Sequence, residues 1–275
     1  MKTISQIFAR NGIADAAGIP LSACRVTKPR LLEGLAFVPQ SVYIGVVPYY
    51  AAEAAADPQR NVSLYAAAKD YHLYLSFLGE KIIAEAQKEF PEGHFALFGD
   101  HSPLDERHAA AVAGLGILGD NGLLITEKYS SFIFLFEILT DLAADTVPAV
   151  PKHCEGCGAC RAACPAKGDK ALCLSAVTQK KGQLSPAEEA LLRRCGSAWG
   201  CDICSLVCPH TAAARAAGTL NTPLDFFHGN IITQICEKTV ENDADFAERA
   251  YSWRKKETVL RNLRLLPNSE DKEHK

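Results

Sequence analysis

Cysteines are the residues of this 275-residue chain best suited to chemistry, because five of its eleven fall within residues 154–173. The stretch CEGCGACRAACP follows the pattern C-x2-C-x2-C-x3-C-P. In that pattern the first three thiolates bind one [4Fe-4S] cluster and the fourth binds a neighbouring cluster. The first cluster is therefore expected to bind Cys154, Cys157 and Cys160, and the second cluster is expected to bind Cys164.

A second cysteine group, CDICSLVCP, completes most of both ligand sets. The crossed arrangement gives its last cysteine, Cys208, to the first cluster, and gives Cys201 and Cys204 to the second. The second cluster then lacks one ligand, which either Cys173 or Cys195 can supply. Spacing alone leaves that choice open.

Structural zinc is the alternative use for paired cysteines. Zinc sites usually combine two separate Cys-x2-Cys pairs and do not run three cysteines at two-residue spacing before Cys-Pro, so the pattern favours iron-sulfur clusters. A chain of this length with 48% hydrophobic residues buries a core without crosslinks. The isolated Cys24 and Cys236 are expected to be small buried hydrophobes.

The pattern of apolar residues predicts an α+β fold in three parts: an N-terminal α/β domain (1–148), a ferredoxin-like two-cluster domain (149–222) and a helical segment with a disordered tail (223–275). A buried strand is expected at SVYIGVVPYY, a short strand ending in a turn at HFALFGD, and one long helix or a pair over residues 61–87. A further helix is expected to start at an N-cap, Ser102, and to end at Gly114. GLLITE and SSFIFLFEI are expected to pair as strands.

The apolar segments and the net charge exclude several classes of protein. The N-terminus has no continuous apolar segment of the kind that directs secretion, and the longest apolar run is too short to span a bilayer, so we expect a cytoplasmic protein with no membrane partner. The net charge of −3 gives no bulk attraction for nucleic acid. Paired clusters carry single electrons, and the large N-terminal domain must hold their acceptor. The chain is therefore predicted to be a reductase.

The order of several segments resembles the epoxyqueuosine reductases, relatives of reductive dehalogenases that join a cobalamin-binding domain to a two-cluster ferredoxin domain. The matching segments are KDYHLYL, GDHSPLDER, AGLGILGDNGLLI, SSFIFLFEILTDL, the first cysteine run, the region of Cys173, GCDICSLVCP and SWRKKETVLRN. The resemblance implies that Cys173, and not Cys195, is the eighth cluster ligand.

The resemblance also implies the reaction, which is reduction of the epoxide of epoxyqueuosine in tRNA to queuosine, with two [4Fe-4S] clusters, cobalamin and an external electron donor such as a flavodoxin or ferredoxin. Asp100 matches the family's proton donor, and burial beside a corrinoid would raise its pKa. An aspartate in such a turn also commonly satisfies backbone groups. Glycines would let backbone approach a large flat cofactor. The implied cofactor-binding residues are Gly114, Gly116, Gly119, Asn121 and Ser131.

Departures from the family concern the substrate more than the cofactors. The family usually has lysine at Asp120, tryptophan at Ile117 and Trp-Asn at the two residues after Pro209. The C-terminal helical-repeat extension that many members carry, and that is thought to help hold tRNA, is not expected here. The stretch WRKKETVLRNLR would then have to meet the tRNA phosphates. A relative that reduces another small molecule, and a two-cluster electron carrier without catalysis, are the alternatives.

Overall fold

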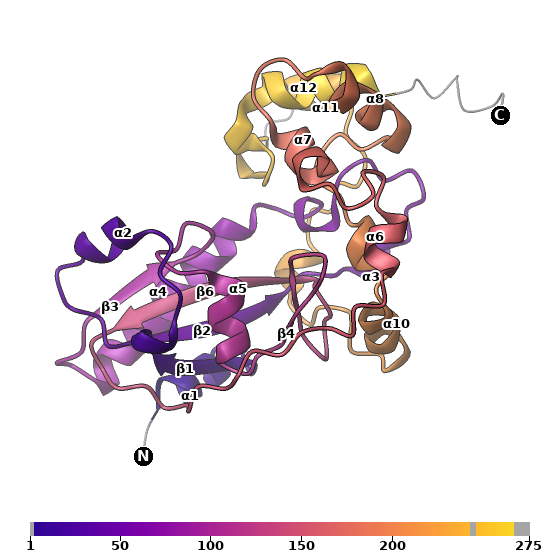
Figure 1. Ribbon diagram of the computed structural model, residues 1–275. Coiled ribbons are helices and arrows are strands. Elements are labelled where there is room, and N and C mark those ends of the chain that lie inside the picture. The colour runs from indigo at the N-terminus through magenta and orange to yellow at the C-terminus, as the bar shows by residue number, and fades with distance from the viewer. Residues whose placement is uncertain (1–2, 243–245, 267–275) are drawn as a thin grey trace. The chain divides into compact units, whose positions relative to one another are not determined.

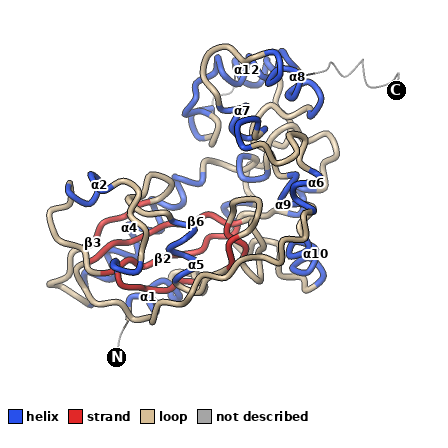
Figure 2. The backbone as a smooth tube through the Cα atoms, viewed as in Figure 1, coloured by secondary structure: helices blue, strands red, loops and turns tan. Residues whose placement is uncertain are grey.

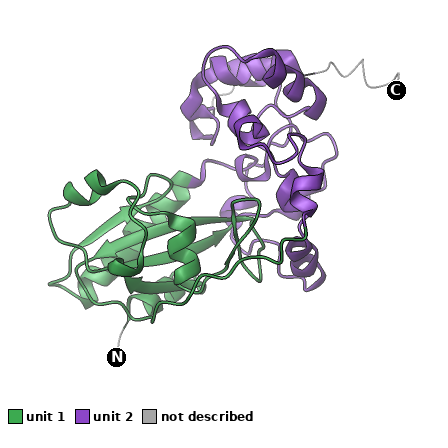
Figure 3. Ribbon diagram, viewed as in Figure 1, with its two compact units in different colours: residues 1–48, 72–157 green, residues 49–71, 158–275 purple. Residues whose placement is uncertain are grey.

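The computed structural model describes residues 3–242 and 246–266. The chain forms an α+β fold with two compact units that interleave along the sequence (Figure 3). Unit 1 combines Met1–Pro48 with His72–Cys157, and unit 2 combines Tyr49–Tyr71 with Gly158–Lys275. The first cysteine run is therefore divided between the units, after Cys157.

Unit 1 is built on a four-stranded antiparallel sheet (Figures 1 and 2). The strands lie side by side in the order β1 (Ala16–Pro20), β2 (Ser41–Pro48), β6 (Ile133–Thr140) and β3 (Phe95–Phe98). Every residue of β2 is buried, as the β-branched run SVYIGVVP predicts for a central strand. The predicted strand in HFALFGD is confirmed as β3.

Unit 1 contains the helices α1 (Ile4–Arg10), α2 (Pro29–Glu33), α4 (Tyr71–Glu89) and α5 (Glu106–Val112). The first residue of α4, Tyr71, belongs to unit 2. A capping box between Thr3 and Gln6 starts α1. The alanine-rich α5 packs against the sheet in one core with Val42, Leu135 and Leu139. Short alanine side chains let this helix lie close to the strands, so the loop before it is held against the sheet.

The start of α5 differs from the sequence prediction. Its N-cap is Asp105, whose carboxylate accepts the backbone N–H of His108, whereas Ser102 lies outside the helix. The Ser102 hydroxyl instead donates to the buried carboxylate of Glu137. The Ser102 oxygen also accepts the backbone N–H of Leu104 at 3.0 Å, so it makes a local bond of the capping kind although the helix starts only after Asp105. The predicted end is confirmed, because Gly114 follows the helix with φ +76°.

Two further element predictions were wrong in part. The helix expected over 61–87 begins only at Tyr71, because backbone groups at Asn61 and Ser63 bond to Thr233 and Trp199 of the same unit. GLLITE does not pair with the following strand. Its residues Leu124–Ile125 form β5, which pairs with β4 (Ile117–Leu118) across an Asp-Asn-Gly turn. Strand β6 pairs with β2 and β3.

Unit 2 is a set of short helices. They are α3 (Ala52–Ala55), α6 (Ala159–Ala163), α7 (Leu174–Gln179), α8 (Pro186–Cys195), α9 (Ile203–Leu206), α10 (Pro209–Ala216), α11 (Glu237–Asn242) and α12 (Lys255–Leu265), with 3-10 turns at Leu64–Ala66, Lys170–Leu172, Asp225–Phe227, Phe246–Glu248 and Ser252–Arg254. The predicted helical character of residues 223–265 is thus met by short helices and turns. Leu174, Leu191 and Leu192 form an apolar core. The PNSEDKEHK tail lies outside the described residues. Across the described chain, the helices are too short or too polar to span a bilayer.

Candidate functional site

Four cysteines of unit 2 come together at the ends of its short helices. Cys164 ends α6, Cys173 immediately precedes α7, and Cys201 and Cys204 lie at and within α9. Burial, together with the nearby charges of Asp202, Cys204 and Cys173, raises the pKa of the Cys201 thiol to about 12. Burial also raises the pKa of Cys204, with Cys173, Cys160 and Cys164 as charged neighbours.

These neighbours bear on the missing ligand. Cys173 acts on both Cys201 and Cys204, whereas Cys164 is the cysteine that acts on the pKa of Cys195. The Cys195 side chain packs against the leucine core of α7 and α8. Cys173 therefore neighbours two members of the predicted set, Cys201 and Cys204, and Cys195 neighbours one, Cys164, while Cys201 packs against the same leucine core as Cys195.

A buried aspartate fixes the loop that carries two of these cysteines. Asp202 lies between Cys201 and Cys204 and is 6% exposed. Its carboxylate accepts hydrogen bonds from Arg60 (2.6 Å), the backbone N–H of Leu64 (2.9 Å) and the Ser63 hydroxyl. A buried carboxylate with three donors is strongly held. The segment 60–64 therefore positions the second cysteine group.

Cys154 is held by the β4–β5 hairpin of unit 1. The backbone N–H of Asp120 donates to the Cys154 sulfur at 3.3 Å, and the backbone N–H of Cys154 donates to the Leu118 carbonyl at 3.0 Å. Amide donors to a ligand sulfur stabilise the thiolate and adjust cluster potential. Over the described residues, groups of three His, Cys, Asp or Glu side chains arranged to hold one metal ion are absent. In a [4Fe-4S] cluster each thiolate binds a different iron.

The predicted glycines have local roles in this hairpin. A Cβ atom at Gly116 would lie 2.6 Å from the Ile125 carbonyl oxygen, and one at Gly119 would lie 2.5 Å from the Asn121 side-chain oxygen. That oxygen accepts the N–H of Leu123 at 3.1 Å. Gly114 ends α5, and the buried Ser131 precedes β6. The structure therefore places Gly116, Gly119 and Asn121 in and beside one hairpin. In the sequence, Gly114 comes before this hairpin and Ser131 comes after it.

Asp100 lies in the turn that follows β3. Its backbone has φ +54°, a left-handed conformation that aspartate tolerates better than most residues. Its side chain is 53% exposed, and one carboxylate oxygen lies 3.4 Å from Nε2 of His72 in α4. The structure places His72 at the Asp100 carboxylate, and the helical spacing of the sequence gives no signal of this.

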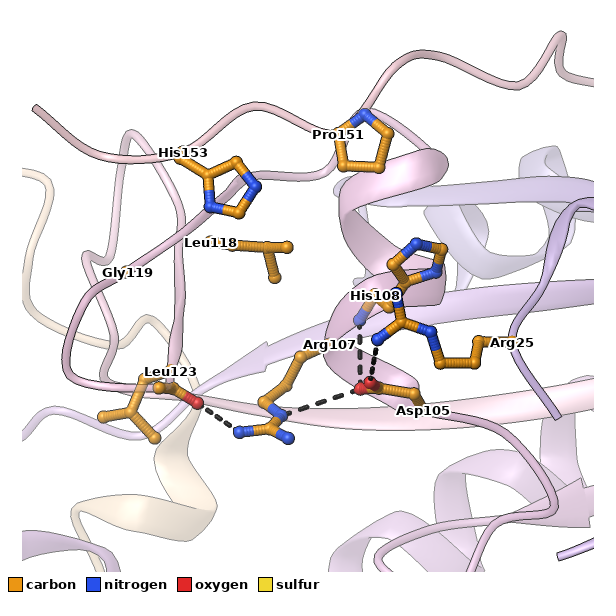
Figure 4. Close-up of a pocket in the computed structure, with 10 residues that line it drawn as sticks. Arg25, Asp105, Arg107, His108, Leu118, Gly119, Leu123, Pro151 and His153 are labelled. Atoms are coloured by element: carbon orange, nitrogen blue, oxygen red, sulfur yellow. Dashed lines mark hydrogen bonds and ion pairs between the residues drawn. The ribbon is translucent and has the colours of Figure 1, made fainter. Parts of the chain in front are cut away.

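A cavity of about 430 Å³ lies beside the β4–β5 hairpin (Figure 4). Asp105 lies between two arginines, 3.3 Å from Arg25 Nη1 and 3.7 Å from Arg107 Nε. Arg107 also donates to the Gly122 carbonyl. The lining residues are Arg25, Asp105, Arg107, His108, Leu118, Gly119, Gly122, Leu123, Pro151 and His153.

The cavity suits a small anion or one polar substituent of a larger group, because two guanidinium groups face one carboxylate. A whole cobalamin is larger than this space, and two of the predicted glycines, Gly116 and Gly119, are blocked by contacts inside the hairpin, whereas Gly114 has open space beside it. These residues by themselves therefore do not fit a complete corrinoid. The cysteine groups, in contrast, fit iron-sulfur clusters.

An α+β protein with a sheet unit, an acid at the end of an edge strand and a cysteine-rich helical unit has the features of an iron-sulfur oxidoreductase. Comparison with known proteins agrees. The chain belongs to the epoxyqueuosine reductase family. No family model matches the chain.

Similar curated proteins include two epoxyqueuosine reductases. The one from Leadbetterella byssophila is 31% identical over 204 residues, which are 71% of this chain and 65% of that protein. The one from Gloeobacter violaceus is 30% identical over 195 residues, 68% of this chain and 61% of that protein. The chain thus spans less than two thirds of the length of these relatives.

Solved structures show the same fold. Epoxyqueuosine reductase from Streptococcus thermophilus superposes with a TM-score of 0.74 at 22% identity, covering 95% of this chain and 79% of that one. An epoxyqueuosine reductase bound to an epoxyqueuosine-modified tRNA-Tyr stem loop gives 0.75 at 19% identity, again covering 95% and 79%.

Proposed function

We propose that this protein is a two-cluster [4Fe-4S] reductase that converts epoxyqueuosine to queuosine in tRNA. One observation carries the proposal: Asp100 lies in the left-handed turn after β3, half exposed and against His72, in a chain of this family. A carboxyl group in that position can reach a bound substrate and exchange protons with solvent.

The reaction requires a proton as well as electrons. Converting an epoxide to an alkene breaks both C–O bonds and releases the oxygen as water, which consumes two electrons and two protons. Asp100 is proposed to give a proton to the departing oxygen, and His72 to hold the Asp100 carboxyl group and help restore its proton. An external one-electron donor, such as a flavodoxin or ferredoxin, supplies the electrons through the clusters.

We assign the cluster ligands as the sequence pattern does, with Cys154, Cys157, Cys160 and Cys208 in one set and Cys164, Cys173, Cys201 and Cys204 in the other. The neighbours of Cys201 and Cys204 support the second set. Cobalamin is included in the proposal on the strength of the family resemblance alone. The steps assigned above to Asp100 and His72 do not depend on it.

A second candidate substrate is a small molecule that is not part of a tRNA. The contacts made by the basic helix α12 favour this candidate. Arg261 donates to the carbonyls of Lys180 (2.7 Å) and Gly182 (2.6 Å), and Arg264 pairs with Glu237 at 3.1 Å. Lys256 donates to the Glu241 carbonyl at 2.8 Å. Much of the basic stretch proposed to meet phosphates is therefore engaged within its own unit.

The test is an assay on an epoxyqueuosine-containing tRNA stem loop. Reconstituted protein with cobalamin and a chemical reductant is incubated with the stem loop and, separately, with the free nucleoside, and products are measured by mass spectrometry at two salt concentrations. Conversion of the stem loop that weakens with salt supports tRNA as the substrate. Conversion of the free nucleoside alone indicates the small-molecule alternative, and conversion of neither contradicts the proposed reaction.

A further inference from the structure

Strand β6 carries a glutamate in the middle of an apolar sheet. Glu137 is fully buried and lies in register with Ile44 of β2 and Phe98 of β3. One carboxylate oxygen accepts the Ser102 hydroxyl, while Oε1 is buried without a hydrogen-bond donor among the described residues. An ionised carboxylate in such surroundings is strongly unfavourable, and a buried polar atom without a partner requires an explanation.

A second, partly buried carboxyl group interacts electrostatically with the first. Glu106 is in the first turn of α5, the helix that packs on β6, and its Oε1 is also buried without a described donor. The Glu106 side chain accepts the backbone N–H of Asp100. Glu106 therefore connects the buried sheet position to the turn that carries the proposed proton donor.

The charges around both groups favour retention of a proton. Burial and the negative charges of Glu106 and Asp105 raise the pKa of Glu137 to about 8, against the opposing effect of the Ser102 hydroxyl. Burial raises the pKa of Glu106 to about 7, with Asp100 adding and with Lys28 and Arg107 opposing. Glu137 in turn raises the pKa of the nearby Cys24 thiol. Two carboxyl groups whose negative charges repel in this way cannot both ionise easily.

We propose that Glu137 and Glu106 form a buried carboxyl pair that holds one shared proton near neutral pH, and that Glu106 uses this arrangement to position Asp100. The shared proton satisfies the two unpartnered oxygens. The Glu106 carboxylate then keeps its bond to the Asp100 amide and so maintains the left-handed turn. Glu106 and Glu137 are positioning residues, and the part of the inference that concerns Asp100 rests on the proposed function.

Infrared spectroscopy of the full chain tests the shared proton without any assay of activity. Wild type near neutral pH should show the C=O stretching band of one protonated carboxylic acid, which disappears as pH rises. Glu137→Gln should remove the band, and Glu127→Gln, at an exposed position of the same unit, should retain it. A wild-type spectrum without the band below neutral pH, or a Glu137→Gln spectrum that keeps it, overturns the pair.

Two milder variants keep the test informative if Glu137→Gln does not fold. Glu106→Gln removes the neighbouring charge, so the midpoint at which the band disappears should fall on the order of one pH unit. Ser102→Ala removes the hydroxyl donor that favours the ionised form of Glu137, so its midpoint should rise. Unchanged midpoints in both variants contradict the pair.

The positioning role predicts a rescue. Glu106→Ala leaves the Asp100 amide without its acceptor and should lower kcat about tenfold with little change in KM, while Glu106→Gln, which retains an acceptor oxygen, should recover most of kcat. Equal kcat values for the alanine and glutamine variants overturn the positioning role. Wild type without turnover refutes the proposed function instead, and the infrared result then still decides whether the pair exists.

Discussion

The two units organise their chemistry in opposite ways. In unit 2 the candidate ligands are close in sequence, with Cys201, Cys204 and Cys208 within eight residues. In unit 1 the residues around Asp100 come from distant segments, with His72 in α4, Glu106 in α5 and Glu137 in β6. Local spacing can encode a cluster site, whereas a proton-donor site must be assembled by the sheet. The proton-donor site should therefore be sensitive to substitutions that leave the clusters intact.

The largest expected effect is at Asp100. Asp100→Asn keeps the shape and hydrogen bonding of the side chain but cannot give a proton, so turnover should fall by about 10²–10⁴-fold. Iron content should stay at the wild-type value, because the residue belongs to the sheet unit. Glu127→Gln is the matched control and should leave turnover unchanged. An Asp100→Asn protein that lost iron would show that the two sites are not separable.

The next effect concerns the eighth ligand. Cys173→Ala should lose one of the two clusters, and with it about half of the iron. Cys195→Ala should retain both clusters, because Cys173, and not Cys195, neighbours both Cys201 and Cys204. Iron and sulfide analysis with electron paramagnetic resonance measures both. The reverse pattern would return Cys195 to the ligand set.

Asp202 tests whether the cysteine unit also depends on distant residues. Asp202→Ala leaves Arg60 and Ser63 without their buried acceptor and should lower the free energy of unfolding by about 3–5 kcal/mol. The second cluster should also become easier to lose, since Cys201 and Cys204 flank this position. Chemical unfolding followed by cluster absorbance measures both effects. A variant with wild-type stability and iron content would show that the local motif needs no support from segment 60–64.

The smallest expected effect is on the free energy of unfolding, which should depend on pH with opposite signs in the two units. The pKa of Glu137 is raised to about 8, so the folded protein binds this proton more tightly, and stability falls as pH rises, by at most about 1.4 kcal/mol per pH unit. Lys180 and the Ser185 backbone hold the pKa of Glu188 down to about 2, so its contribution is present near neutral pH and lost in acid.

Thermal unfolding of two variants across pH checks these signs. Relative to wild type, Glu137→Gln should gain stability as pH rises above neutral, while Glu188→Gln should be less stable near neutral pH and equal to wild type in strong acid. If the difference in stability between each variant and wild type did not change with pH, neither carboxyl group would have the protonation state assigned to it.

The sequence by itself determined the family, the α+β class, the central strand β2, the end of α5 at Gly114 and the cysteine pattern. Each of these is written in residue types at short range: a β-branched run, a glycine after a helix, thiols at fixed spacing. The resemblance also singled out Asp100. Cys236, expected to be buried, is exposed in the structure, and isolated cysteines carry no pattern that predicts burial.

Only the tertiary structure decided the surroundings of these residues. Ser102 has the right type and spacing for an N-cap, yet it bonds to a glutamate 35 residues away, and Asp105 caps the helix instead. The approach of His72 to Asp100, and of Glu106 to Glu137, depends on how α4 and α5 lie against the sheet. Hydrogen bonds and charge interactions act through space, so a one-dimensional pattern can name the groups without stating which of them meet.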